Sequence, residues 1–131
     1  MKKIIFISVI GCFFFLACTL ETNETPLSDP ADHNMKFIPE KPTAADDIKL
    51  VVFDDCTYNV LSGVKRNGKI IDIRKHFNSM MKLPCLQQND TISIGQLPEG
   101  TYTVNYKLVD LSTEVKDSIS LSYAFALTVA K

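Results

Sequence analysis

Apolar and polar residues alternate with a period of two along most of the chain after Met35, and turn residues separate the alternating runs. This pattern is typical of half-buried β-strands. Residues 36–38 predict a first strand that ends at Pro39, and the missing N–H of proline favours an edge position for it. Residues 48–53 are apolar on both faces and predict a central strand.

Residues 60–75 predict a β-hairpin. Asn67 and Gly68 suit the centre of a type I′ turn, in which both positions need a positive φ. The pairs about that turn are Val64 with Ile71 and Ser62 with Ile73. The opposite face of the hairpin carries Lys65, Asp72 and Arg74. Gly63 indicates a bulge.

The second half of the domain continues the pattern. Residues 76–83 alternate weakly and predict a short helical turn, and residues 91–94 predict a short strand. Residues 118–129 alternate without interruption, and twelve residues at ~3.3 Å each would extend for about 40 Å. Because that is long for a domain of this size, we expect a bend or bulge near Tyr123 and Ala124, or a protruding end.

The segment Leu97-Pro98-Glu99-Gly100-Thr101-Tyr102 places a Pro/Gly turn directly before a strand. It resembles the corner before the penultimate strand of immunoglobulin-like and fibronectin type III-like sandwiches. The resemblance implies that Tyr102 buries its ring and bonds its hydroxyl to backbone. With about seven short strands, we expect residues 35–131 to form an all-β, immunoglobulin-like β-sandwich. The chain has no tryptophan, so the resemblance is to the broad sandwich architecture, and a closed barrel is the alternative fold.

Residues 1–18 follow a different pattern. Lys2 and Lys3 precede an uncharged run, residues 4–16, that ends at Ala17 and Cys18. The run is shorter than the ~20 apolar residues that span a bilayer, but it fits the apolar region of a signal peptide. The segment resembles the lipobox signal of bacterial lipoproteins, in which the cysteine is acylated and becomes the N-terminus.

This resemblance implies a lipoprotein signal peptide at residues 1–17 and lipid attachment at Cys18. Thr19 follows, where Asp would imply retention at the inner membrane, so the resemblance favours a lipid anchor in the outer membrane. Three alternatives stay open: an uncleaved anchor, cleavage before Cys12, and ordinary cleavage near Ala17 that releases a secreted domain.

Residues 18–34 are rich in Thr, Asn, Asp, Glu and Pro and have few large apolar residues. Such a segment buries too little surface to offset the entropy of ordering, so we expect a flexible tether. Asp29, Asp32 and His33 could be taken for a metal cluster, but a solvated linker is the favoured interpretation.

The four cysteines have separate predicted fates. Cys12 leaves with the signal peptide and Cys18 carries lipid, which leaves Cys56 and Cys85 in an oxidising compartment. We therefore predict a disulfide between them. A zinc site is disfavoured without CxxC spacing, and a nucleophilic cysteine would need a nearby histidine.

The net charge of the chain and the distribution of its basic residues indicate which classes of partner it could bind. Loss of Lys2 and Lys3 from the 14 basic residues leaves 12 against 15 acidic ones, a net charge of −3. This disfavours nucleic acid, which is bound mainly through phosphate neutralisation. Basic residues concentrate in one stretch, which contains Lys65, Arg66, Lys69, Arg74, Lys75 and Lys82. Lys65, Arg66, Lys69 and Arg74 form a candidate docking face for an acidic glycan, a lipid headgroup or a protein; the alternative is a solvated hairpin that lysine protects from edge pairing.

No catalytic, cofactor or metal motif stands out. The acidic pairs at 46–47 and 54–55 suggest calcium, but a strand of six residues holds them ~20 Å apart. The domain has one histidine, His76, and neither a G-x-S-x-G motif nor a P-loop. We expect the protein to have no enzymatic activity and no cofactor. We expect it to be a lipid-anchored binding, adhesion or accessory module that contacts an envelope protein or glycan. A structural envelope component and a protease-inhibitor-like sandwich are the alternatives.

Overall fold

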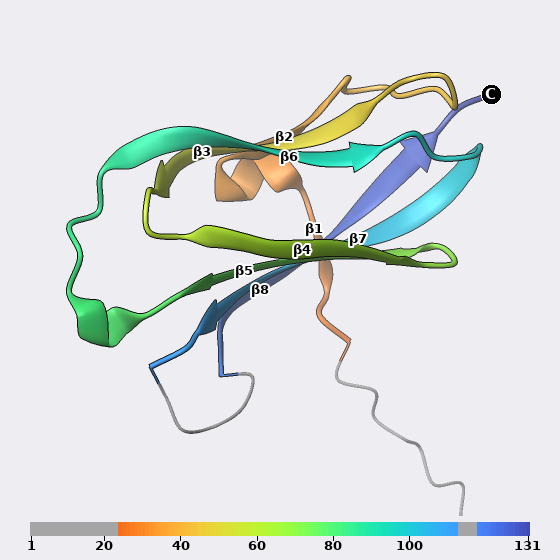
Figure 1. The fold of residues 1–131 in the computed structure, drawn as a ribbon. Helices are drawn as coiled ribbons and strands as arrows, with labels where there is room; N and C mark the ends of the chain where they lie inside the picture. Colours follow the sequence, from red (N-terminus) through yellow and green to blue (C-terminus); the bar gives the residue numbers. More distant parts are fainter. Residues whose placement is uncertain (1–23, 113–117) are drawn as a thin grey trace, which may run out of the picture.

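The computed structural model describes residues 24–112 and 118–131 and arranges them in two β-sheets that face each other (Figure 1). The smaller sheet has the order β2-β3-β6 and the larger one the order β1-β8-β7-β5-β4. The strands of the smaller sheet are β2 (Met35–Ile38), β3 (Ile48–Cys56) and β6 (Gln87–Gly95). Those of the larger sheet are β1 (Leu27–Ser28), β4 (Val60–Asn67), β5 (Ile70–Phe77), β7 (Gly100–Asp110) and β8 (Ile119–Val129). The predicted all-β sandwich is confirmed.

The core lies between the sheets and consists of the inward-facing residues of the alternating strands. Its most deeply buried apolar side chains include Ile48, Leu50, Ile71, Ile73, Ile92, Tyr102, Val104 and Phe125. Strand β3 is central in its sheet and β2 lies at an edge, as the sequence predicts. Burial of these apolar surfaces provides the main driving force for folding.

Strands β5 and β7 are parallel neighbours, with Ile71 opposite Val104 and Ile73 opposite Tyr106. The chain leaves the larger sheet after β5, forms β6 in the smaller sheet and returns as β7 (Figure 1). This excursion allows two strands to run in the same direction, since parallel strands need a crossover connection.

The hairpin between β4 and β5 forms, but its predicted register is wrong. Asn67 pairs with Ile70, so Gly68 and Lys69 occupy the centre of the turn, and Val64 lies opposite Ile73. Gly68 has a φ of 59°, and a glycine with positive φ at the first central position suits a type II′ turn. The predicted bulge is confirmed by a register shift between Leu61 and Gly63.

Strand β8 is regular at Tyr123 and Ala124, which pair in unbroken register with Tyr106 and Asn105. The register shift lies nearer the start of β8, where Leu108 and Val109 of β7 pair with Leu121 and Ile119. The prediction of a bulge near Tyr123 is therefore wrong. The short helical turn predicted within residues 76–83 is confirmed as a 3-10 helix, η2 (Ser79–Met81).

Part of the segment expected to be a flexible tether instead contacts the sandwich. Strand β1 pairs in parallel with β8, and the 3-10 helix η1 (Pro30–His33) follows it. The Asp29 carboxylate caps η1 by accepting a hydrogen bond from the Ala31 N–H at 2.9 Å. The His33 ring stacks on Tyr123 with ring centroids 3.7 Å apart. Local capping and backbone pairing therefore order a polar segment that has almost no apolar side chains.

Candidate functional site

An open groove of about 470 Å³ lies on the outer face of the larger sheet. Its basic side chains come from three adjacent strands: Lys65 of β4, Arg74 and His76 of β5, and Lys107 of β7. Because Arg74 lies directly opposite Lys107 in the β5–β7 register, two cations are held side by side. We call this surface the basic groove.

Among residues 24–112 and 118–131, one carboxylate, that of Asp72, also lines the basic groove. Asp72 lies opposite Lys65 on β4, and its Oδ1 accepts a hydrogen bond from Asn105 Nδ2 at 2.9 Å. The remaining lining residues are small or apolar: Ser62, Gly63, Ile73 and Leu111. The groove therefore presents more basic than acidic groups and favours an anionic ligand.

The four residues of the predicted docking face do not form one surface. Lys65 and Arg74 line the basic groove, whereas Arg66 and Lys69 lie over the ring of Tyr102, at 5.6 and 4.4 Å from its centroid. Neighbouring residues of a strand point to opposite faces, so Lys65 and Arg66 cannot share one. Sequence reasoning missed Lys107, which reaches the groove only through the non-local pairing of β7 with β5.

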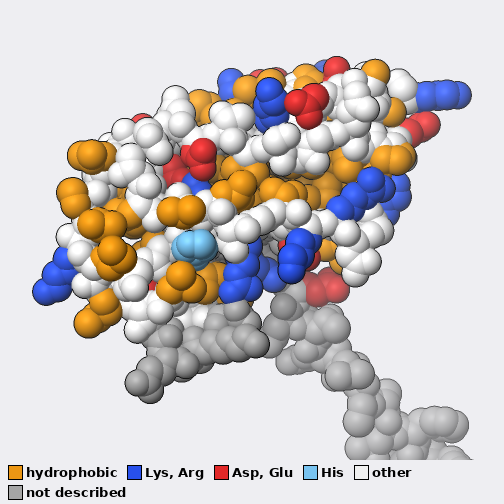
Figure 2. Space-filling model, viewed as in Figure 1, with side chains coloured by type: hydrophobic (Ala, Val, Ile, Leu, Met, Phe, Trp, Pro, Cys, Tyr) orange, Lys and Arg blue, Asp and Glu red, His pale blue; other side chains and the backbone are white. Residues whose placement is uncertain are grey.

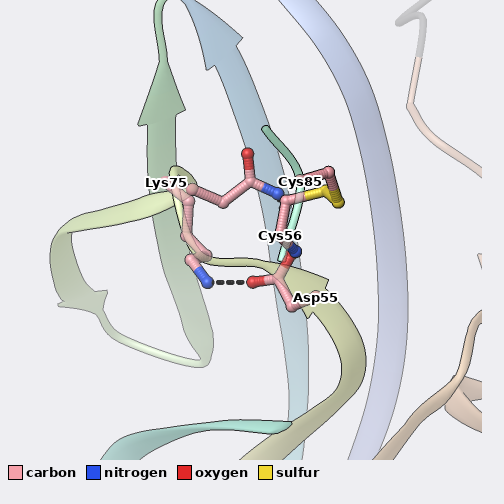
Figure 3. The surroundings of a disulfide bond; sticks show 5 residues. Asp55, Cys56, Lys75 and Cys85 are labelled. Carbon is pink, nitrogen blue, oxygen red and sulfur yellow. Dashed lines mark hydrogen bonds and ion pairs between the residues drawn. A yellow bond between two sulfur atoms is a disulfide. The ribbon is translucent and has the colours of Figure 1, made fainter. Parts of the chain in front are cut away.

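Lys75, which belongs to the same basic stretch of sequence, is fully buried on the inner face of the larger sheet. Its ammonium forms ion pairs with Asp55 and Asp90 from the smaller sheet. Figure 3 shows Lys75 pointing toward Asp55, beside the disulfide between Cys56 and Cys85. The predicted disulfide is confirmed, and it joins residues 29 positions apart.

Tyr102 has the predicted corner geometry. Its side chain is almost completely buried, and its hydroxyl donates a hydrogen bond to the Pro98 carbonyl oxygen at 2.7 Å. The Lys69 ammonium donates in turn to the Tyr102 hydroxyl and to the Glu99 carbonyl, each at 3.4 Å. Lys69 and Tyr102 thus connect the hairpin turn to the corner before β7, which is a structural role.

A cluster of exposed apolar side chains covers the end of the sandwich beside the basic groove. Eight of the eleven large apolar side chains that are exposed in the described residues belong to it, and we call it the apolar tip. Its members are Val60, Leu61, Met80, Met81, Leu83, Leu86, Leu111 and Ile119. Figure 2 shows hydrophobic side chains gathered at the left end of the molecule, where the connection from β5 to β6 lies in Figure 1. Leu111 also lines the basic groove, so the two surfaces adjoin.

The acidic residues considered for calcium separate in the structure. The Asp46 carboxylate accepts hydrogen bonds from the Thr43 N–H at 2.7 Å and the Thr43 hydroxyl at 2.9 Å, and these bonds lower the pKa of Asp46. Asp47 pairs with Lys49 at 3.9 Å, while Asp55 is directed toward Lys75. Residues 24–112 and 118–131 contain no group of three or more His, Cys, Asp or Glu residues placed to hold a metal ion.

Comparison with known proteins assigns no family, since the chain matches no family model, no curated protein and no solved structure. Cys18, the predicted lipid attachment residue, lies outside the described residues. Within the part of the chain that the structure describes, no helix has the length and apolar character needed to cross a membrane.

Proposed function

We propose that the protein is a lipid-anchored module of the bacterial cell envelope that binds an acidic segment of another envelope protein and performs no catalysis. The N-terminal sequence supports export and anchoring through Cys18, by its resemblance to lipoprotein signals. The binding role is supported by one observation above all: the basic groove adjoins the apolar tip at Leu111.

A protein partner is favoured over a glycan by the composition of this combined surface. Among the residues that the structure describes, no Phe, Tyr or Trp lines the basic groove, so this lining offers no aromatic platform on which a sugar ring would stack. Clustered exposed apolar side chains next to polar groups are typical of surfaces that bind proteins. We therefore expect acidic side chains of the partner to occupy the groove and apolar side chains to cover the tip.

The binding role can be tested by surface cross-linking in intact cells, affinity capture and mass spectrometry. The test variant replaces Lys65, Arg74 and Lys107 by Gln. The control variant replaces three exposed lysines elsewhere in the chain, Lys36, Lys41 and Lys49, by Gln and has the same net charge. We expect the wild type and the control to retain the same partner, the groove variant to lose it, and the binding to weaken with added salt.

Two outcomes would contradict this proposal. Capture that is equally strong in the groove variant would exclude the basic groove as the docking site. Capture of no protein in repeated experiments, together with retention of an acidic polysaccharide, would replace the protein partner by a glycan.

The anchoring role has its own test, because Cys18→Ala removes the only thiol that the proposed lipid could modify at the processing site. We expect the variant to leave the membrane fraction after a carbonate wash, whereas Cys12→Ala stays there. If Cys18→Ala still sediments with membranes, the lipid anchor is wrong and an uncleaved hydrophobic anchor replaces it.

A further inference from the structure

Three charged side chains from three strands meet between the two sheets. Lys75 of β5 is 0% exposed and Asp55 of β3 is 9% exposed, while the side chain of Asp90, from β6, is 33% exposed. The Lys75 Nζ donates to Oδ2 of Asp55 and, at 2.6 Å, to Oδ2 of Asp90. The cluster therefore links the larger sheet to both Asp55 and Asp90 of the smaller sheet. Figure 3 shows the contact between Lys75 and Asp55.

The backbone is shaped to bring Asp55 into this cluster. In β3 the inward residues Ile48, Leu50 and Val52 alternate regularly, and unbroken alternation would place Asp55 on the outer face. A register shift between Val52 and Asp55 inserts one extra residue, and Asp54 adopts a φ of 53°. A β-bulge of this kind redirects the side chains that follow it, and here it turns Asp55 inward.

The charge balance of the cluster is unfavourable for a permanent ion pair. One ammonium faces two carboxylates, and burial of an ion pair commonly costs more free energy than the mutual attraction returns. The buried Tyr106 lies in the same environment. Its burial, and then the charges of Asp55 and Asp90, raise the pKa of its hydroxyl. An uncharged amide between Lys75 and Asp55 would remove two charges from the interior.

The two oxygens of Asp55 have different partners. Oδ2 contacts the Lys75 amine, whereas Oδ1 accepts hydrogen bonds from Asn59 Nδ2 at 2.7 Å and from the Cys56 N–H at 3.0 Å. Two donors on one oxygen stabilise the negative charge that develops there when a nucleophile adds to the carboxyl carbon. Asp90, on the other side of the amine, is placed to accept its proton.

We propose that Lys75 and Asp55 become joined by an intramolecular isopeptide bond, formed by the folded chain itself with Asp90 as the proton-transfer group. A proton first passes from the Lys75 ammonium to Oδ2 of Asp55. The neutral amine then attacks Cγ of Asp55, and Asp90 takes a second proton from the nitrogen. The Oδ2 hydroxyl then leaves with the proton held by Asp90. One C–N bond forms, one C–O bond breaks and one water molecule departs, with no change of oxidation state. Alignment of the groups by the fold replaces an external activating reagent, as in other intramolecular reactions held in close geometry.

The test is the mass of the peptides obtained from the purified full chain after reduction of the disulfide and proteolysis. We expect a branched peptide that contains both Lys75 and Asp55 and is lighter than its two parts by one water molecule. Peptide masses do not depend on how the N-terminus is processed, so the result is independent of the lipid anchor.

Three variants separate a covalent bond from an ordinary ion pair. Lys75→Arg keeps the positive charge but cannot form this amide, so we expect no branched peptide. Asp90→Asn keeps Lys75 and Asp55 but removes the proton acceptor, and we expect the loss of water to be abolished or greatly slowed. Lys49→Arg is the control, because Lys49 pairs with Asp47 at the surface at 3.9 Å, and it should retain the branched peptide.

The proposal is overturned if wild-type protein, with its disulfide formed and its β-sheet circular dichroism intact, yields Lys75 and Asp55 only in separate peptides of full mass. A branched peptide of unchanged yield in Asp90→Asn would leave the bond but refute the role of Asp90.

Discussion

Tyr102 shows how much a single residue contributes to the joining of distant segments. Its ring is buried in the core, its hydroxyl bonds to Pro98, and the ammonium of Lys69 lies 4.4 Å from the ring centroid. It therefore fixes the corner before β7 and holds the hairpin turn against that corner.

We expect Tyr102→Phe to lower the free energy of unfolding by about 1 kcal/mol, because the substitution removes a hydrogen bond and leaves the buried ring in place. Urea denaturation measures the change. Tyr58→Phe is the matched control, since the Tyr58 ring packs near Phe77 and is only partly buried. Equal stabilities of Tyr102→Phe and the wild type would show that the corner hydrogen bond contributes nothing.

Asp110 at the end of β7 is a second residue whose environment has a measurable consequence. Its carboxylate accepts hydrogen bonds from the Ser79 hydroxyl at 2.6 Å and from the Ser112 N–H at 2.9 Å. The Ser79 hydroxyl and then the Ser112 N–H lower the pKa of Asp110 below its ordinary value. These bonds attach η2 to the end of the larger sheet.

A lowered pKa in the folded protein means that ionised Asp110 stabilises the fold above the unfolded pKa of about 3.9. This contribution is lost as the pH falls through the lower folded pKa. NMR titration of the Asp110 carboxyl should give a midpoint below the ordinary range. Ser79→Ala should move the midpoint upward, and a midpoint at or above the ordinary value in the wild type would contradict the assignment.

At the scale of elements, two glycines of the β4 strand and its turn offer a controlled comparison. Gly68 and Gly63 both have open space where a Cβ would be added, but only Gly68 has a positive φ. We expect Gly68→Ala to cost about 1 kcal/mol through backbone strain alone. Gly63→Ala should be neutral or stabilise by up to about 1 kcal/mol. Urea denaturation measures the free energy of unfolding of both variants. Equal changes in the two variants would mean that the turn relaxes to accommodate alanine at position 68.

The hairpin also shows what the sequence could and could not predict. Period-two alternation correctly assigned Ile71 and Ile73 to the inner face, and the same alternation places Lys75 there. The alternation could not distinguish a turn at Asn67 and Gly68 from the observed turn at Gly68 and Lys69. Both turns place the same side chains on the same faces, and they differ only in which residues lie opposite each other. In this hairpin, local alternation predicts which face a side chain occupies, but the turn conformation determines its cross-strand neighbour.

Two features of the candidate sites depend on information that local alternation does not carry. The inward direction of Asp55 comes from a bulge at Asp54, which reverses the alternation. The place of Lys107 in the basic groove comes from the parallel pairing of β5 with β7. Both follow from how the strands are assembled rather than from the residues beside them.

For the whole molecule, the disulfide between Cys56 and Cys85 holds the connection from β5 to β6, which carries half of the apolar tip, to the end of β3. The connection from β5 to β6 contains the exposed Met80, Met81, Leu83 and Leu86, so it buries little apolar surface of its own. Besides the disulfide, a backbone hydrogen bond of 3.0 Å from Thr57 to Leu86 joins this connection to the end of β3. The disulfide should therefore govern both the global stability and the order of the tip.

We expect Cys56→Ala/Cys85→Ala to lower the free energy of unfolding by roughly 3–4 kcal/mol, because it restores the chain entropy of a loop of about 30 residues in the unfolded state. Chemical denaturation measures this loss, and hydrogen exchange should show faster exchange in residues 79–86 than in the core strands. A reducing agent should bring the wild type down to the stability of the double variant and leave the double variant unchanged. If the reduced wild type keeps its full stability, packing rather than the disulfide holds the connection from β5 to β6 in place. The proposed partner surface at the apolar tip would then stay ordered without the disulfide.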